Sequence, residues 1–168
     1  AYGASAPALP AAVAAGEGAP SRAGLLDLAP HTTYHYRIVA RNAAGTAYGQ
    51  DATFTTQAVP ATASTGPATG VTATRATLHA TVNARNAATS VVFQFGPDPA
   101  YGETVAALPA PVEGTEDVEV TAIVAGLAPG TTYHYRVVAE NAAGTATGQD
   151  ATFTTPPLPR TYLPHVRR

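Results

Sequence analysis

LAPGTTYHYRVVAENAAGTATGQDATFTT, residues 127–155, decides the fold of this chain, because nearly the same sequence occurs once before, at residues 28–56. The two copies lie 99 residues apart without a gap, and 25 of their 29 positions are identical. The differing pairs are His31/Gly130, Ile38/Val137, Arg41/Glu140 and Tyr48/Thr147. A self-similar unit of this length is a repeated domain rather than a short motif. The 168 residues therefore hold one complete unit and part of another.

The repeated stretch has the alternation of a β-hairpin, since successive side chains of a strand project to opposite faces. We expect a core face made of Tyr133, Tyr135, Val137 and Ala139, and an outer face made of His134, Arg136, Val138 and Glu140. Residues 141–144, Asn-Ala-Ala-Gly, suit a tight turn. Residues 149–155 return as a threonine-rich strand whose one large side chain is Phe153.

The complete unit, residues 57–156, contains further short strands separated by turn residues, which is the pattern of an antiparallel sandwich. Two buried faces are predicted, one from Leu78, Ala80 and Val82 and one from Val91, Phe93 and Phe95. Residues 96–99 must turn the chain because they contain two prolines, and residues 104–108 follow as an edge strand. Another strand is marked by Val118, Val120, Ile123 and Val124, with its alternation expected to break around Thr121 and Ala122.

The first unit is incomplete in this sequence. Residues 1–27 align with residues 100–126 at the same offset, with about ten matches that include Ala-Tyr-Gly at 1–3 and at 100–102. The residues before 100 in the complete unit have no counterpart before Ala1, so the first unit lacks about three strands. We expect these strands to lie upstream in a longer chain or to come from another chain.

The motif Leu127-x-Pro-Gly-Thr-x-Tyr133-x-Tyr-Arg-Val-x-Ala-x-Asn141-x-x-Gly144 resembles the E-to-F corner and F strand of fibronectin type III domains. Residues 76–83, 93–96 and 100–102 resemble a bacterial subgroup of such repeats found in secreted or surface proteins. The resemblance implies tandem immunoglobulin-like sandwiches, with residues 1–56 supplying strands C′, E, F and G only. It also implies tyrosine corners at Tyr34 and Tyr133, in which the hydroxyl bonds back to the chain. Ala80 stands where many members have a core tryptophan, so the core must depend on Phe93, Phe95, Tyr133 and Tyr135.

The composition of the chain argues against several classes of function. The chain has no cysteine, which excludes disulfides, thiolate metal sites and cysteine nucleophiles. A net charge of −2 gives no reason to expect a nucleic-acid partner. Eighteen uncharged apolar residues in succession occur nowhere, so no membrane span is expected.

Candidate chemical groups favour a structural interpretation. Tyr-His-Tyr occurs at 34–36 and at 133–135, but alternation places His134 on the face opposite its tyrosines, with no Cys, Asp or second His nearby in sequence. The acidic residues between 113 and 119 do not have EF-hand spacing and are interpreted as a solvated loop beside an edge strand. The few serines lie in no nucleophile elbow, and no phosphate loop is present. We therefore expect no enzymatic activity, no cofactor and no metal.

After the repeats, residues 157–168 form a proline-rich linker and a tail in which Tyr162, Leu163 and Val166 are candidates for a self-assembly strand. The leading hypothesis is a non-enzymatic module of a secreted bacterial surface protein or extracellular filament. Its partner would be a second copy joined head to tail, or neighbouring domains of a longer chain. A spacer or accessory domain of a polysaccharide-degrading enzyme or adhesin is the alternative. Outward threonines permit O-linked glycans.

Overall fold

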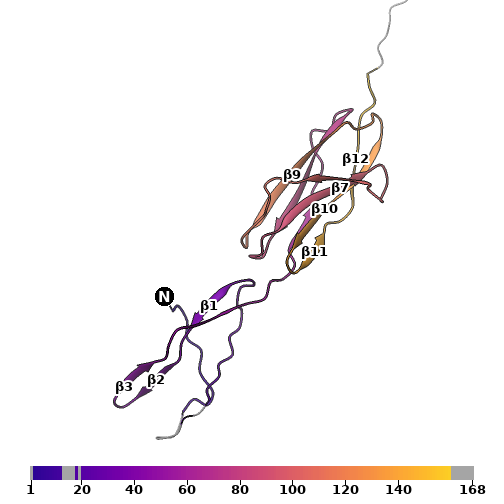
Figure 1. The fold of residues 1–168 in the computed structure, drawn as a ribbon. Helices are drawn as coiled ribbons and strands as arrows, with labels where there is room; N and C mark the ends of the chain where they lie inside the picture. The colour runs from indigo at the N-terminus through magenta and orange to yellow at the C-terminus, as the bar shows by residue number, and fades with distance from the viewer. Residues whose placement is uncertain (1, 13–17, 19, 160–168) are drawn as a thin grey trace, which may run out of the picture. The chain divides into compact units, whose positions relative to one another are not determined.

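The computed structural model describes residues 2–12, 18 and 20–159. The chain divides into two compact units, Ala1–Gln57 and Ala58–Arg168, which are described separately and called unit 1 and unit 2. All regular secondary structure of the described residues is β-strand (Figure 1).

Unit 2 is a sandwich of two antiparallel sheets (Figure 1). One sheet has the order β5-β6-β9, formed by Thr62–Thr65, Arg75–Asn83 and Asp117–Ala125. The other has the order β11-β10-β7-β8, with β12 also paired to β10. Its strands are β7 (Ser90–Gly96), β8 (Glu103–Ala106), β10 (Thr132–Asn141), β11 (Gly144–Thr147) and β12 (Ala151–Thr154). This order is that of a fibronectin type III sandwich, with strands A, B and E facing C′, C, F and G.

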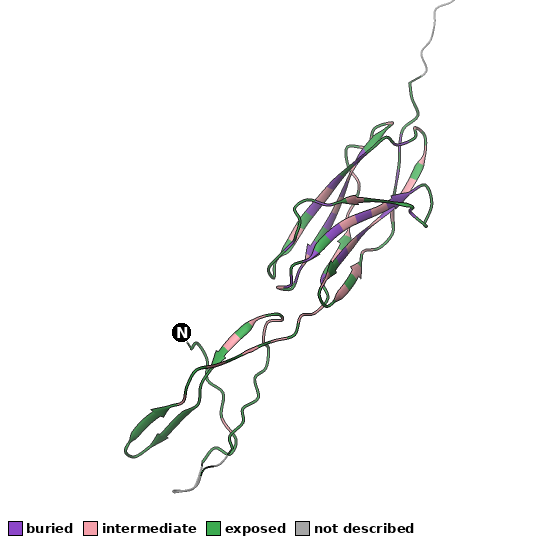
Figure 2. Ribbon diagram, viewed as in Figure 1, coloured by how far each residue is buried: buried purple, intermediate pink, exposed green. Residues whose placement is uncertain are grey.

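The core of unit 2 lies between the two sheets, where alternate side chains of every long strand are buried (Figure 2). The predicted inward sets on β6 and β7 are buried as expected, and so are Tyr135, Val137 and Ala139 on β10. Tyr133 lies at the margin of the core and is partly buried. In the register of β10 with β7, Val137 lies opposite Phe93. The core therefore combines small alanines on β6 with aromatic rings on β7 and β10, without a tryptophan.

The alternation of β9 is unbroken, which corrects the predicted break around Thr121 and Ala122. Strand β9 pairs with β6 along its whole length, so its register with β6 is continuous. The buried face includes Ala122 between Val120 and Val124, while Ile123 points outward and is 53% exposed. The alternation was not recognised in the sequence because the inward residue, Ala122, is small and the outward residue, Ile123, is large and apolar.

Unit 1 contains four short strands in two separate pairs. Strand β1 (Thr33–Tyr36) pairs with β4 (Ala52–Thr55), and β2 (Val39–Asn42) pairs with β3 (Gly45–Tyr48). Together β1 and β2 occupy the repeat positions of β10, which is continuous in unit 2. Strand β10 is held straight by pairing with β7 from His134 to Glu140, and unit 1 has no described counterpart of β7.

The expected strands C′ and E of unit 1 are not present among its described residues, where only an isolated bridge joins Leu9 and Arg22. The same bridge joins Leu108 and Thr121 in unit 2. In unit 2, C′ pairs with β7 and E pairs with β6, so these strands depend on neighbours that unit 1 lacks. The fold is all-β, with one complete immunoglobulin-like sandwich and one incomplete one.

Candidate functional site

The E-to-F corner of unit 2 is built around Tyr133. Its hydroxyl accepts a hydrogen bond of 2.9 Å from the backbone N–H of Ala128, as a tyrosine corner requires. The hydroxyl of Thr155 donates to the carbonyl of Ala128 at 2.7 Å, which ties the end of the last strand to the same corner. The Tyr133 ring stacks on Phe153 with a centroid distance of 5.5 Å. The corner is thus made entirely by residues of the repeated stretch.

Unit 1 has the same corner. The N–H of Ala29 donates to the Tyr34 hydroxyl at 2.9 Å, and the Thr56 hydroxyl donates to the carbonyl of Ala29 at 2.7 Å. Tyr34 stacks on Phe54 at 5.7 Å. Because every partner lies within residues 28–56, this corner forms although no opposing sheet is found among the described residues of unit 1.

A polar cluster on the outer face of unit 2 joins three segments that are distant in sequence. The Tyr101 hydroxyl donates to Oδ1 of Asp150 at 2.9 Å, and Nδ1 of His134 lies 2.8 Å from Oδ2 of the same carboxylate. The guanidinium of Arg136 lies over the Tyr101 ring, 4.5 Å from its centroid, and its Nε donates to Gln94 at 2.9 Å. The cluster holds the turn after β7 and the segment before β12 against β10.

The same cluster recurs in unit 1 at positions 99 residues earlier. Tyr2 donates to Oδ1 of Asp51 at 2.5 Å, and Nδ1 of His35 lies 2.8 Å from Oδ2. The guanidinium of Arg37 lies over two rings, 4.3 Å from the centroid of Tyr2 and 4.4 Å from that of Tyr48. Unit 2 has threonine at the position of Tyr48, and its arginine is instead held by Gln94 of β7. The second tyrosine thus gives Arg37 a contact in place of the strand that unit 1 lacks.

Hydrogen bonding and burial shift the pKa values of the cluster. Donation from His134, and then from Tyr101, holds the pKa of Asp150 below its ordinary value. Donation from Tyr2 and then His35 does the same for the pKa of Asp51. Burial, followed by the bond to Asp150, raises the pKa of Tyr101, so its hydroxyl stays protonated and continues to donate. This chemistry suits a clamp between loops rather than a nucleophile.

The sequence did not predict this cluster. Alternation predicts an exposed strand histidine at 134, with no Asp close to it in sequence, whereas its side chain is 25% exposed and is paired with Asp150, 16 residues away. The available signal was the Ala-Tyr-Gly match at 1–3 and 100–102, together with an identical aspartate in both copies. Linking them requires knowing that the turn after β7 and the segment between β11 and β12 meet beside β10.

No three histidine, aspartate or glutamate side chains gather closely enough to hold a metal ion within residues 2–12, 18 and 20–159. In the acidic loop, Oδ1 of Asp117 accepts a hydrogen bond from Nδ2 of Asn83 at 3.0 Å. No helix that could cross a membrane is found in the part of the chain that the structure describes.

The largest difference between the units is the exposure of one sheet face. Tyr135 and Val137 have no exposed surface, whereas their counterparts Tyr36 and Ile38 are 51% and 54% exposed. Figure 2 shows the strands of unit 1 in the colours of exposed and half-buried residues. Among its described residues, unit 1 therefore presents the inner face of a sandwich with no second sheet covering it.

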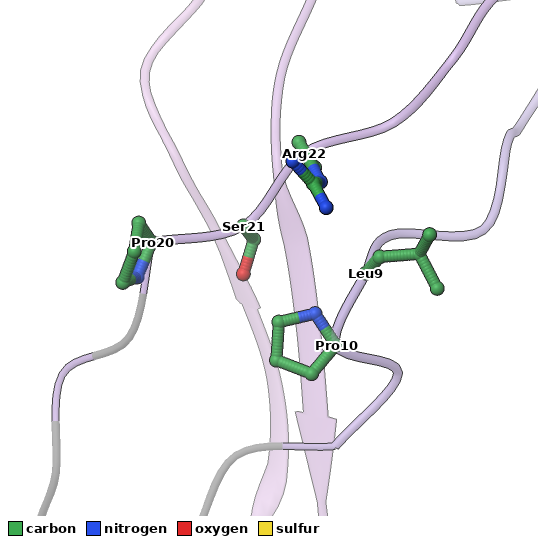
Figure 3. Close-up of a pocket in the computed structure, with 5 residues that line it drawn as sticks. All are labelled: Leu9, Pro10, Pro20, Ser21 and Arg22. Carbon is green, nitrogen blue, oxygen red and sulfur yellow. The ribbon is translucent and has the colours of Figure 1, made fainter.

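A shallow hollow of about 310 Å³ lies elsewhere in unit 1, lined by Leu9, Pro10, Pro20, Ser21 and Arg22. Figure 3 shows that these residues come from two facing segments. Ser21 stands at the repeat position of Val120, which is fully buried in unit 2. The lining residues align with residues 108–109 and 119–121 of unit 2, and Arg22 is the one charged residue among them. The expected self-assembly residues Tyr162, Leu163 and Val166 lie outside the described residues.

No protein-family model matches this chain, and no curated protein matches it. Among solved structures, the sensor domain of the anti-sigma factor RsgI4 in Pseudobacteroides cellulosolvens is similar at 20% identity with a TM-score of 0.47, over 59% of this chain and 97% of that one. Domains d3–d4 of the rat CD45 extracellular region are similar at 15% identity with a TM-score of 0.46, over 86% of this chain and 73% of that one. Domains FN1–FN3 of chicken CNTN1 are similar at 17% identity with a TM-score of 0.38, over 82% of this chain and 45% of that one. The fold itself is defined by the strand order of unit 2, which is that of a fibronectin type III sandwich.

Proposed function

We propose that this chain is a non-enzymatic structural part of a secreted bacterial surface protein or extracellular filament. In this proposal unit 1 is completed by strands from outside residues 1–57. The observation that carries the proposal is the open inner face of unit 1, whose counterpart in unit 2 is fully buried at Tyr135 and Val137. Large exposed apolar faces rimmed by polar groups mark interaction sites.

Two features that unit 1 shares with unit 2 support the idea that other strands complete it, rather than that it is a degenerate repeat. Both the Tyr34 corner and the cluster around Asp51 repeat the geometry of unit 2, although the opposing sheet is absent. A degenerate repeat would have no reason to keep these side chains in place. Unit 1 is therefore proposed to be a prepared half of a sandwich.

Two sources of the missing strands follow from the proposal. One is a preceding segment of a longer chain, as in an ordinary tandem array. The other is a second copy, whose tail residues 161–166 would add a strand to the open edge of unit 1. Head-to-tail contacts of the second kind do not close and would produce a filament.

Size-exclusion chromatography and electron microscopy of the full chain, read together with amide hydrogen exchange, test the proposal. A variant lacking residues 157–168 and a control with residues 161–166 scrambled are measured alongside. Polymers that disappear in both variants support donation by a second copy. A monomer in which β10 is protected while β1 and β2 exchange freely supports strands from upstream. A monomer in which β1 and β2 are protected as strongly as β10 contradicts the proposal, because unit 1 would then be complete by itself.

A further inference from the structure

The first strand of unit 2 shows how a sandwich of this sequence holds its strand A. Residues 59–66, which include β5, contact β10 through three hydrogen bonds. The N–H of Val137 donates to Oγ1 of Thr65 at 3.2 Å, and the Tyr135 hydroxyl donates to the carbonyl of Gly66 at 2.7 Å. At the other end, Nδ2 of Asn141 donates to the carbonyl of Val59 at 3.0 Å.

Close approach is also required on the G side of this strand. A Cβ atom at Gly148 would lie 2.3 Å from Oγ1 of Thr65 and 2.8 Å from its backbone nitrogen. Such distances are well inside van der Waals contact, so only glycine leaves room for the strand. Alanines complete the fit, since Ala61 is buried and Ala63 packs against the core.

Unit 1 repeats the residues of β10 and of the G side that make these contacts. Tyr36, Ile38, Asn42 and Gly49 stand at the repeat positions of Tyr135, Val137, Asn141 and Gly148. The Tyr36 hydroxyl, the Ile38 N–H and Nδ2 of Asn42 make no hydrogen bond to any residue that the structure describes. Oδ1 of Asn42 accepts from the N–H groups of Ala44 and Gly45, which fixes the amide so that its Nδ2 is free to donate.

We propose that Tyr36, Ile38, Asn42 and Gly49 form an acceptor slot for one extended strand with the pattern of residues 59–66. That strand begins Val-Pro, has small residues at its inward positions, and carries a hydroxyl followed by glycine six and seven positions after the valine. The inference rests on the proposed function and specifies its partner. Unit 2 supports this proposal, because its strand of residues 59–66 is bound by the Tyr135 hydroxyl, the Val137 N–H and the Asn141 amide, which stand at the repeat positions of Tyr36, Ile38 and Asn42.

The chain's own tail is the competing occupant. Leu158, Pro159 and Thr161 lie 99 residues after Val59, Pro60 and Thr62, so the tail begins like a strand A. However, Pro164 takes the place of Thr65 and His165 that of Gly66. Proline has no hydroxyl to accept the Ile38 N–H, so the slot should prefer the pattern of residues 59–66 to the tail.

Titration of the full chain with a synthetic peptide of residues 58–99 tests the slot. This peptide supplies the strands that correspond to β5, β6 and β7. Calorimetry gives its affinity, and nuclear magnetic resonance shows whether the amide signals of Ile38 and the Asn42 side chain shift. A Thr65→Val peptide keeps the shape but removes the acceptor, and a Thr62→Val peptide is the matched control because Thr62 is exposed.

We expect the peptide to bind, with Thr65→Val weakening binding about 2- to 10-fold and Thr62→Val changing it by less than about 2-fold. Tyr36→Phe in the chain should weaken binding by a similar factor. Tyr48→Phe is its control because it keeps the ring that lies against Arg37. The tail peptide, residues 156–168, should not displace the longer peptide.

The possible results separate the two proposals. No binding of the 58–99 peptide to the variant that lacks residues 157–168, in which no tail can occupy unit 1, contradicts the proposed function, and the slot falls with it. Binding that is equally sensitive to Thr65→Val and Thr62→Val, or displacement by the tail peptide, overturns the slot and leaves the proposed function standing.

Discussion

Unit 1 and unit 2 carry nearly the same residues on their F and G strands, yet they bury them very differently. Tyr135 and Val137 are sealed in a core, while Tyr36 and Ile38 are half exposed. The local features, namely the tyrosine corner and the polar cluster, are alike in both units. The comparison separates what a short sequence specifies by itself from what it specifies only with partner strands.

Continuity of a strand belongs to the second kind. Strand β10 runs unbroken because β7 pairs with it, whereas the same sequence in unit 1 is divided into β1 and β2. In unit 2, β12 pairs with residues 132–135 and β11 with residues 138–141, so Arg136 and Val137 are paired by β7 alone. The break between β1 and β2 falls at the equivalent residues, 37 and 38. Substitutions at matched positions of the two units therefore test this difference.

The largest difference is expected for truncation of the core tyrosines. Tyr135→Ala should lower the free energy of unfolding of unit 2 by about 3–5 kcal/mol, because it removes a fully buried aromatic side chain and leaves a cavity. Tyr36→Ala should change stability by less than about 1 kcal/mol, since that side chain is half exposed. Chemical denaturation of both variants measures the difference, and equal effects would contradict the assignment of unit 1 as open.

A smaller difference is expected at the paired glycines. Gly148→Ala should destabilise unit 2 by about 1–3 kcal/mol, because the new methyl group would meet the backbone and side chain of Thr65. Gly49→Ala should cost less, because a Cβ at Gly49 would meet Cγ2 of Ile38 as a Cβ at Gly148 would meet Cγ1 of Val137, but it would meet no atom that corresponds to Thr65. Thermal unfolding of the two variants provides the measurement. A costly Gly49→Ala would show that unit 1 already holds a strand in its slot.

The smallest effect is expected from the pH dependence of the polar cluster. The pKa of Asp150 is lowered by its bonds to His134 and Tyr101, so its contribution to stability is fully present above the unfolded value of 3.8. That contribution is lost as pH falls through the lower folded value. Asp150→Asn should therefore reduce the melting temperature at pH 5, and this deficit should shrink as pH falls below 3.8. Glu103→Gln, on the exposed edge strand, is the control for the change in charge. A deficit of Asp150→Asn that stays constant as pH falls below 3.8 would contradict this role.

Most of the fold of unit 2 was predictable because alternation and the repeat are properties of short stretches. The inward faces of β6, β7 and β10 followed from side-chain periodicity alone. The register of β9 did not, because Ile123 is apolar and outward while Ala122 is small and inward. Hydrophobicity alone cannot decide which of these two side chains points into the core.

Features that depend on contacts between distant segments could not be predicted. The bond from Tyr101 to Asp150 spans 49 residues and forms only when two loops meet beside β10. Strands C′ and E of unit 1 were expected from their alignment with unit 2, but a strand also needs a neighbour to pair with. The alignment shows which residues of unit 1 correspond to a strand of unit 2, but it does not show whether a neighbouring strand is there to pair with them.

If unit 1 is one half of a sandwich, supplying the other strands should complete it. Residues 58–99 can be joined ahead of Ala1, since Ala1-Tyr2-Gly3 then follows Pro99 as Ala100-Tyr101-Gly102 does in unit 2. Amide hydrogen exchange is measured at residues 36–42 in the extended chain and in the original chain. The account predicts that protection rises to the level of residues 135–141. Exchange at residues 36–42 that stays as fast as in the original chain would contradict it.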